Sequence, residues 1–249
     1  MRRPVFAANW KMNHGPTDAR EFMRTFLAHY ARHSDRLVLF FPSSVALPAV
    51  VESLRERSDI RVGVQNIHWE DKGAFTGEIS GSMARDAGAH YALVGHSERR
   101  HVFRETDEDT ARKVAACFRT GLVPILCVGE KLEQREAGAT ESVVTRQLRE
   151  GLSTLDAAQV AHMIIAYEPV WAIGTGKNAT PADASAVHAA IRHELRERSP
   201  EKGAAVPILY GGSVNRGNAA ALLEAPDVDG LLVGGASLDA EGWSSIVCA

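Results

Sequence analysis

The hydrophobic positions of this chain fall into eight short runs, and each run is followed by a longer stretch with helical periodicity. The runs are rich in apolar and β-branched residues, and few polar positions interrupt them. They are VFAANW (5–10), LVLFF (37–41), RVGVQN (61–66), YALVG (91–95), VPILCVG (123–129), MIIAYE (163–168), VPILYGG (206–212) and GLLVGG (230–235). Strands that are apolar on both faces are typical of a parallel sheet covered by helices. The pattern therefore predicts eight strand-and-helix units.

The intervening stretches carry apolar residues at helical spacing, as in TDAREFMRTFLAHYARH and PADASAVHAAIRHELRER. In the second stretch, Thr180 suits the N-cap and Pro181 suits the first helical position. An open doubly wound sheet is compatible with this alternation. However, eight units in 249 residues, without a linker or a break in composition, have the size and count of a closed barrel. We therefore predict an α/β fold, a single-domain (β/α)8 barrel over residues 1–249.

The residues that end the runs are chemically biased, and in such a barrel the active site lies on loops at the carboxyl ends of the strands. The first, fourth and sixth runs end in candidate catalytic side chains, and the seventh and eighth end in glycine loops. These residues are Asn9 and Lys11; His96, Ser97 and Glu98; Glu168; Gly211, Gly212 and Ser213; Gly234 and Gly235. One end of the barrel is thus predicted to hold a cation, an imidazole, carboxylates and flexible backbone.

The loops after the last two strands favour a bound phosphate, because glycine lets backbone N–H groups approach an anion. The segment GGAS leads into a predicted helix start at Ala236 and Ser237, where the helix dipole favours negative charge. Glu168 can abstract a carbon-bound proton, while His96 and Lys11 stabilise charge on the adjacent oxygen. The residues therefore indicate proton abstraction next to the carbonyl of a phosphorylated substrate.

Each candidate also has an ordinary structural interpretation when it is taken alone. Glu168 can cap a strand, Lys11 can be a solvated surface charge, and His96 can be a satisfied histidine at a helix start. Glycine pairs most often serve turns. Only the combination of these residues at one edge favours catalysis. Four further histidines lie in charged helical stretches and are expected on solvated faces: His29, His33, His188 and His193.

Composition excludes several classes of partner. A net charge of -3 gives no basic footprint for nucleic acid, and no run is long and apolar enough to span a bilayer. Cys117, Cys127 and Cys248 are widely spaced, which argues against a disulfide framework and favours a reducing, cytoplasmic compartment. We expect Cys127 to be a packing residue. No metal is predicted, because zinc and calcium motifs are absent. The GTGK segment (174–177) does not match the full P-loop motif.

Five segments closely resemble the motifs of the triosephosphate isomerase family, in the family's order. They are NWKMN, VGHSERR, AYEPVWAIGTGK, YGGSV and LLVGGASL, and the resemblance extends from Val5 to Leu238. It implies a TIM barrel and an isomerase of glycolysis and gluconeogenesis that needs no cofactor. Such an enzyme interconverts dihydroxyacetone phosphate and D-glyceraldehyde 3-phosphate by proton transfer through an enediolate intermediate.

The resemblance also implies roles for individual residues. Glu168 matches the base and His96 the neutral electrophile, while Lys11 and Asn9 match polar groups of the site and Glu98 the acid near Lys11. The positions that match substrate-binding residues are Asn9, Lys11, Gly174, Ser213, Gly234 and Gly235. Asn178 departs from the family, which more often has Thr or Ser there. The final segment EGWSSIVCA does not resemble the family's motifs.

A lid is predicted directly after the candidate base. The fixed φ of Pro169 makes a stiff junction, Gly174 and Gly176 permit positive φ, and Thr180 anchors the far end. Closure over the substrate would give the apolar Trp171 a purpose, although a static loop packed on the barrel rim is the alternative. The predicted lid comprises Pro169, Val170, Trp171, Ala172, Ile173, Gly174, Thr175, Gly176 and Lys177.

A homodimer is predicted through the loop from Gln65 to Ser80. This loop is longer than a barrel connection needs, and it carries Ile67, Trp69 and Phe75. The alternative is that it folds onto its own barrel. The resemblance implies that it docks on the neighbouring subunit, with the Thr76 region near the partner's active site.

Two other functions are compatible with such a barrel. A phosphosugar aldolase would use Lys11 as a Schiff-base lysine, which borohydride trapping with substrate would reveal. A catalytically silent scaffold is the second alternative, but it gives no reason to retain a base, an electrophile and phosphate loops together. A coupled isomerase assay separates these functions.

Overall fold

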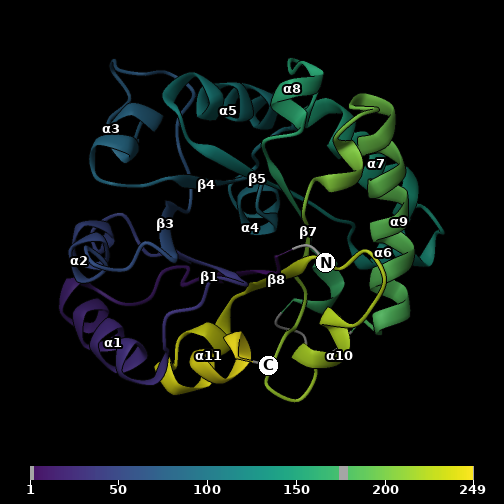
Figure 1. Cartoon of the computed structure of the whole chain (residues 1–249). Coiled ribbons are helices and arrows are strands. Elements are labelled where there is room, and N and C mark those ends of the chain that lie inside the picture. Colours follow the sequence, from purple (N-terminus) through teal and green to yellow (C-terminus); the bar gives the residue numbers. More distant parts are fainter. Residues whose placement is uncertain (1–2, 174–178, 249) are drawn as a thin grey trace.

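The computed structural model describes residues 3–173 and 179–248, and the strands in this part of the chain close into a parallel barrel. Each strand pairs with the next in chain order, and β8 pairs with β1 (Figure 1). The strands are β1 (Val5–Asn9), β2 (Leu37–Phe41), β3 (Ile60–Val64), β4 (Tyr91–Val94), β5 (Val123–Val128), β6 (Ile164–Tyr167), β7 (Ile208–Tyr210) and β8 (Gly230–Val233). The predicted α/β fold, a (β/α)8 TIM barrel, is confirmed.

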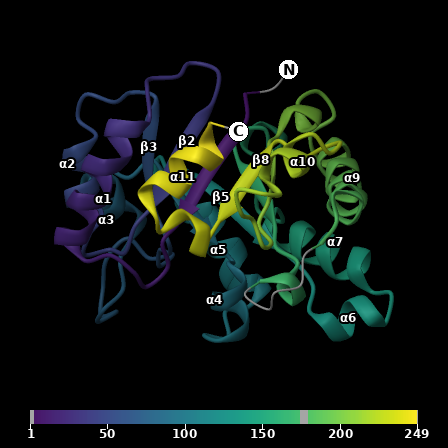
Figure 2. The same ribbon diagram turned by 90° about the horizontal axis from the view of Figure 1, so that it is seen from below.

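Most helices form an outer ring around the strands, whereas α4 (Ser97–His101) appears inside this ring in Figure 1. The others are α1 (Pro16–His29), α2 (Leu47–Ser53), α3 (Gly81–Asp86), α5 (Asp107–Thr120), α6 (Leu132–Glu136), α7 (Thr140–Gly151), α8 (Ala157–Val160), α9 (Pro181–Arg198), α10 (Ala219–Leu223) and α11 (Ala240–Val247). Three short 3-10 helices join them: η1 (Val170–Ala172), η2 (Gly203–Ala205) and η3 (Gly235–Ser237). Figure 2 shows α4 and α6 at the end of the barrel opposite the N-terminus. Among the described helices, none has both the length and the apolar character needed to cross a bilayer.

Strand residues alternate between two apolar layers. In β1, Val5 and Ala7 belong to the inner cluster that also contains Cys127, whereas Phe6 and Ala8 pack in the layer between strands and helices. Both faces are therefore buried, which explains why the strands read as continuous apolar runs. Cys127 is fully buried, as expected of a packing residue.

The start of α9 was predicted correctly. The hydroxyl of Thr180 accepts the backbone N–H of Asp183 at 3.1 Å, and the Asp183 carboxylate accepts the N–H of Thr180 at 3.0 Å. This capping box satisfies two N–H groups that otherwise lack partners at a helix start. The predicted helix start at Ala236 and Ser237 is only the 3-10 turn η3, and the regular helix α11 begins at Ala240.

The expectation that His188 is solvated is wrong. His188 is fully buried and shares a face of α9 with Ala184, Ile191 and Leu195, since residues three and four apart lie on one side of a helix. Its Nδ1 donates to the carbonyl of Asp227 at 2.9 Å, and burial lowers the pKa of the ring to about 4. The other three histidines are exposed or half-buried: His29, His33 and His193.

Candidate active site

A cavity of about 240 Å³ lies at the carboxyl ends of the strands. Five separate strand ends contribute to it, and together they bring most of the predicted site residues into one place. The lining residues are Asn9, Lys11, His96, Glu168, Ile173, Gly211, Gly212, Ser213, Val214, Leu232, Gly234, Gly235 and Ala236. Glu98 does not line the cavity but contacts Lys11, and Gly174 lies outside the described residues.

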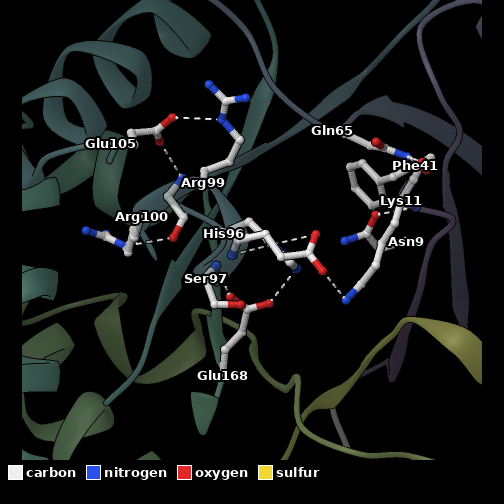
Figure 3. Close-up of polar contacts among 12 residues, drawn as sticks. Asn9, Lys11, Phe41, Gln65, His96, Ser97, Arg99, Arg100, Glu105 and Glu168 are labelled. Carbon is white, nitrogen blue, oxygen red and sulfur yellow. Dashed lines mark hydrogen bonds and ion pairs between the residues drawn. The ribbon is translucent and has the colours of Figure 1, made fainter. Parts of the chain in front are cut away.

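Glu168 and His96 form a buried pair in the wall of this cavity (Figure 3). Oε1 of Glu168 lies 2.9 Å from Nε2 of His96, and Oε2 accepts the backbone N–H of Ser97 at 2.8 Å. Glu168 follows β6, and His96 and Ser97 follow β4, so the barrel joins residues that are far apart in sequence. Both carboxylate oxygens therefore have partners from the loop after β4.

The surroundings of the pair keep Glu168 ionised. Burial by itself would raise the pKa of Glu168, but the His96 ring and the Ser97 N–H stabilise the carboxylate and bring the pKa below its ordinary value. Burial by itself would lower the pKa of His96, but the neighbouring Glu168 outweighs it and raises that pKa. The carboxylate of Glu168 is therefore ionised although both side chains of the pair are almost fully buried.

The N-terminus of α4 fixes which nitrogen of His96 carries the proton. Nδ1 accepts the backbone N–H of Glu98 at 3.2 Å, so in this arrangement the ring proton resides on Nε2. An N–H donated to Nδ1 opposes protonation of the ring at that atom. The imidazole therefore presents Nε2–H to the cavity.

Lys11 reaches the cavity from a left-handed backbone conformation, with φ of 52°. Its N–H donates to the side-chain oxygen of Asn9 at 3.0 Å, and the amide of Gln65 donates to the carbonyls of Lys11 and Phe41 at 2.8 Å each. Its Nζ lies 2.6 Å from Oε1 of Glu98. Such a conformation costs about 1 kcal/mol for a residue with a side chain, so these contacts serve to hold it.

The last loops pass close to the catalytic side chains at two glycines. A Cβ at position 211 would lie 3.0 Å from Cγ of Glu168, and a Cβ at position 234 would lie 3.2 Å from Cε of Lys11. At Gly235, by contrast, a Cβ would meet nothing within 4 Å. The loops after β7 and β8 therefore pack tightly on the base and the cation but leave open space beside Gly235.

Sequence reasoning missed a buried carboxylate that supports the segment after the base. Glu130 is fully buried and accepts the hydroxyl of Tyr167 at 3.1 Å and Nε1 of Trp171 at 2.8 Å. The guanidinium of Arg135 stacks on the Trp171 ring, 4.3 Å from its centroid. The signal that could have revealed Glu130 is its place directly after the fifth predicted strand, because the other site residues also follow the ends of predicted strands.

Only part of the predicted lid lies within the described residues. Pro169 to Ile173 form the η1 turn and its flanks, and Ile173 lines the cavity beside Glu168. The remaining residues of the prediction lie outside the described part of the chain: Gly174, Thr175, Gly176 and Lys177.

The loop of residues 65–80 is covered partly by its own chain. Ile67 is fully buried, and Trp69 is half-buried beneath the guanidinium of Arg112, 5.4 Å from the ring. Phe75 packs on His68 at 4.2 Å between ring centroids but stays 43% exposed. Of the three apolar side chains, only Phe75 is thus left substantially open to solvent.

Comparison with known proteins points to one family. The family model described as triosephosphate isomerase matches residues 4–249. The chain is 51% identical over 247 residues to the triosephosphate isomerase of Moorella thermoacetica, covering 99% of this chain and 98% of that one. It is 48% identical over 250 residues to that of Symbiobacterium thermophilum, covering 100% and 97%. The crystal structure of triosephosphate isomerase from Bartonella henselae is similar, with a TM-score of 0.88, 40% identity and 98% of each chain covered.

Proposed function

Because this chain belongs to the triosephosphate isomerase family, we propose that the Glu168–His96 cavity is the place where it acts. The protein is an isomerase that interconverts dihydroxyacetone phosphate and D-glyceraldehyde 3-phosphate, a reaction of glycolysis and gluconeogenesis. The observation that carries the assignment of the site is the buried Glu168 carboxylate, paired with His96 at a cavity that Lys11 and two glycine loops also line.

Glu168 is the base in this proposal. It removes a proton from the carbon next to the substrate carbonyl and delivers a proton to the neighbouring carbon, with an enediolate between the two steps. Both of its oxygens are engaged, by His96 and by Ser97, so one contact has to be released before the carboxylate reaches the substrate. Its lowered pKa keeps it ionised and ready to accept the proton at neutral pH.

His96 is the electrophile. Its Nε2–H, released from Glu168, donates to the substrate oxygens, where negative charge develops. Moving Glu168 away removes the contact that raises the pKa of His96, and the N–H of Glu98 still points at Nδ1, so the ring acts as a neutral imidazole. Lys11 supplies positive charge at the same oxygens: its backbone N–H donates to Asn9, and its ammonium is held by Glu98.

The substrate phosphate is assigned to the glycine loops after β7 and β8. Ser213, Gly234 and Gly235 line the cavity on the side away from α4, and open space remains beside Gly235. The family resemblance adds Gly174, which lies outside the described residues. Backbone N–H groups of such loops bind phosphate without a side-chain charge.

Isomerisation in heavy water tests the proposed proton transfer. Purified protein is incubated with dihydroxyacetone phosphate in D₂O, and the product is examined for deuterium at the carbon next to the new carbonyl. A carboxylate base that exchanges with solvent predicts deuterium at that carbon. Product that forms at a normal rate without deuterium would contradict a base that exchanges its proton with solvent during the reaction.

We further propose a homodimer. All six large apolar side chains that are exposed in the described chain fall between positions 12 and 103, around the neighbouring strands β1 to β4: Met12, Val45, Phe75, Met83, Val102 and Phe103. Such a concentration is typical of a protein interface. The loop of residues 65–80 ends in Phe75, and the family resemblance puts the Thr76 region near the partner's active site. Sedimentation as a monomer at micromolar concentration would refute the dimer.

Domain organisation and location are part of the same proposal. We infer one catalytic domain over residues 1–249, because the barrel runs from β1 to β8 and α11 packs on α1. We also infer a cytoplasmic protein that needs no cofactor. The location is supported by the cysteines, since Cys117, Cys127 and Cys248 are all free thiols.

A further inference from the structure

Gly95 connects β4 to His96 through a backbone conformation that favours glycine. Its φ is +70°, in the left-handed region. A Cβ at this position would lie 2.7 Å from Nη2 of Arg100 and 3.1 Å from Cγ2 of Thr110. The chain therefore turns sharply, in a tightly filled space, immediately before the candidate electrophile.

Two side chains of opposite charge hold Gly95 from its two ends. The backbone N–H of Gly95 donates to Oε1 of Glu105 at 3.2 Å, and its carbonyl accepts Nε of Arg100 at 2.7 Å. That carbonyl belongs to the peptide bond that joins Gly95 to His96. Figure 3 shows Arg100 and Glu105 on the side of His96 away from Lys11.

The guanidinium of Arg100 is itself fixed in place. Its side chain is only 6% exposed, and it also donates to the carbonyl of Cys127 at 3.2 Å and to Oδ1 of Asp107 at 2.6 Å. It therefore ties together the carboxyl ends of β4 and β5 and the start of α5. The planar fork of arginine suits three acceptors in different directions, which a lysine ammonium does not serve equally well.

We propose that Arg100 is a positioning residue for His96, acting through the Gly95–His96 peptide. This inference rests on the proposed role of His96 in the isomerase reaction. Arg100 holds the plane of that peptide, and the peptide sets the direction in which the His96 ring faces Glu168 and the substrate. A displacement of roughly 1 Å at a reacting group costs on the order of 10²-fold in rate. A loosened peptide is therefore expected to slow the chemical step.

The substitution Arg100→Lys tests the proposal, because it keeps the positive charge but loses the fork. We expect kcat to fall by roughly 10- to 100-fold. KM is expected to stay within about threefold, because Arg100 does not line the phosphate side of the cavity. The ring nitrogen signals of His96, read by NMR of ¹⁵N-histidine-labelled protein, are expected to shift.

Arg192→Lys is the matched control. The Arg192 side chain is 2% exposed and pairs with Asp227 and Asp229, so like the Arg100 side chain it is buried and has a carboxylate partner. It contacts the carbonyl of Val206, before β7, and thus lies at the amino end of the barrel. This control is expected to lower thermal stability while leaving kcat and the His96 signals unchanged.

A second variant keeps the proposal testable if Arg100→Lys fails to fold. Asp107→Asn leaves Arg100 in place but removes the charge that holds Nη1, at a position 21% exposed. A smaller loss of kcat, about two- to tenfold, is expected together with a shift of the same His96 signals.

Folded Arg100→Lys protein with kcat within about twofold of the wild type and unchanged His96 signals would overturn the proposal. The same result in the folded Asp107→Asn protein would overturn it if Arg100→Lys does not fold. The NMR signals do not depend on turnover. If the unsubstituted protein fails to isomerise, the proposed function fails, while a shift of the His96 signals still reports that Arg100 positions the ring.

Discussion

Oε1 of Glu168 lies 2.9 Å from Nε2 of His96, in a pair whose two side chains are 3% and 8% exposed. The contact links the ends of β6 and β4 across the barrel. It stabilises the carboxylate over the protonated acid, and the lowered pKa of Glu168 follows from it. The base is thus held ionised by the same ring that is proposed to act on the substrate oxygens.

Replacing this carboxylate is predicted to abolish most of the activity. Glu168→Gln keeps the size of the side chain but cannot accept the proton, so kcat should fall by about 10²- to 10⁴-fold while KM changes little. Glu168→Asp retains a carboxylate but withdraws it by one methylene, which should still cost on the order of 10²-fold. Steady-state kinetics in a coupled assay measure both variants. Near-normal turnover of the Gln variant would remove Glu168 from the mechanism.

A charge placed on the exposed apolar surface is predicted to separate the proposed dimer. Val102 is 68% exposed beside Phe103, so Val102→Asp would bury a carboxylate in any interface formed there. Sedimentation velocity should then show a monomer, whereas Ala189→Asp, on the exposed side of α9, should leave the dimer intact. Identical sedimentation of the two variants would argue against an interface at this surface.

The sequence was informative where a side chain's place follows from strand order. All eight strands were predicted, with ends that differ from the structure by at most a few residues. Because parallel strands of a barrel end at one rim, Asn9, His96 and Glu168 could be placed together before their contacts were known. Thr180 was predicted as an N-cap for a local reason, since its hydroxyl serves the third residue of the same helix.

Contacts that depend on side-chain direction could not be predicted. The charged composition around His188 suggested solvent, although its spacing from Ala184 and Ile191 puts it on the buried face of α9. The contact of Arg100 with Gly95 is another case, because the two residues are five positions apart and a helix start lies between them. Helical spacing thus pointed to a buried His188 although composition did not, whereas the contact from Arg100 to Gly95 leaves no periodic signal in the sequence.

Buried His188 is predicted to make stability depend on pH. Its folded pKa of about 4 lies below the ordinary histidine value of 6.5, so the unfolded chain binds the additional proton between these two values. Above pH 6.5, His188 should not reduce the free energy of unfolding. As pH falls from 6.5 toward 4, the free energy of unfolding should decline by about 1.4 kcal/mol per pH unit, and by about 3 kcal/mol in total from this group.

Urea unfolding at pH 7.0, 6.0 and 5.0 measures this dependence. His188→Gln removes the titrating group but keeps an N–H that can donate to Asp227, so its stability should fall less steeply over this range. His193→Gln, an exposed histidine on the same helix, is the control and should retain the slope of the unsubstituted protein. Parallel curves for His188→Gln and the unsubstituted protein would exclude His188 as the source.

The segment after Glu168 is proposed to act as a lid, and its described ends are both anchored. At the near end, Nε1 of Trp171 donates to the buried Glu130, and Arg135 stacks on the indole. At the far end, the capping box of Thr180 and Asp183 fixes the start of α9. Between them, Ile173 lines the cavity beside Glu168, where an apolar side chain helps to exclude water.

Deleting residues 173–176 is predicted to leave the barrel and Glu168 in place but to expose the reaction to solvent. Isomerisation should slow sharply, because water around Glu168 weakens the electrostatic contacts that stabilise the enediolate. An enediolate that is no longer enclosed can also expel its phosphate, so inorganic phosphate and methylglyoxal should appear during turnover. Both products are followed in parallel with isomerisation, and circular dichroism checks that the variant folds. A folded deletion variant that isomerises at the normal rate and releases no additional phosphate would show that this segment is not a lid.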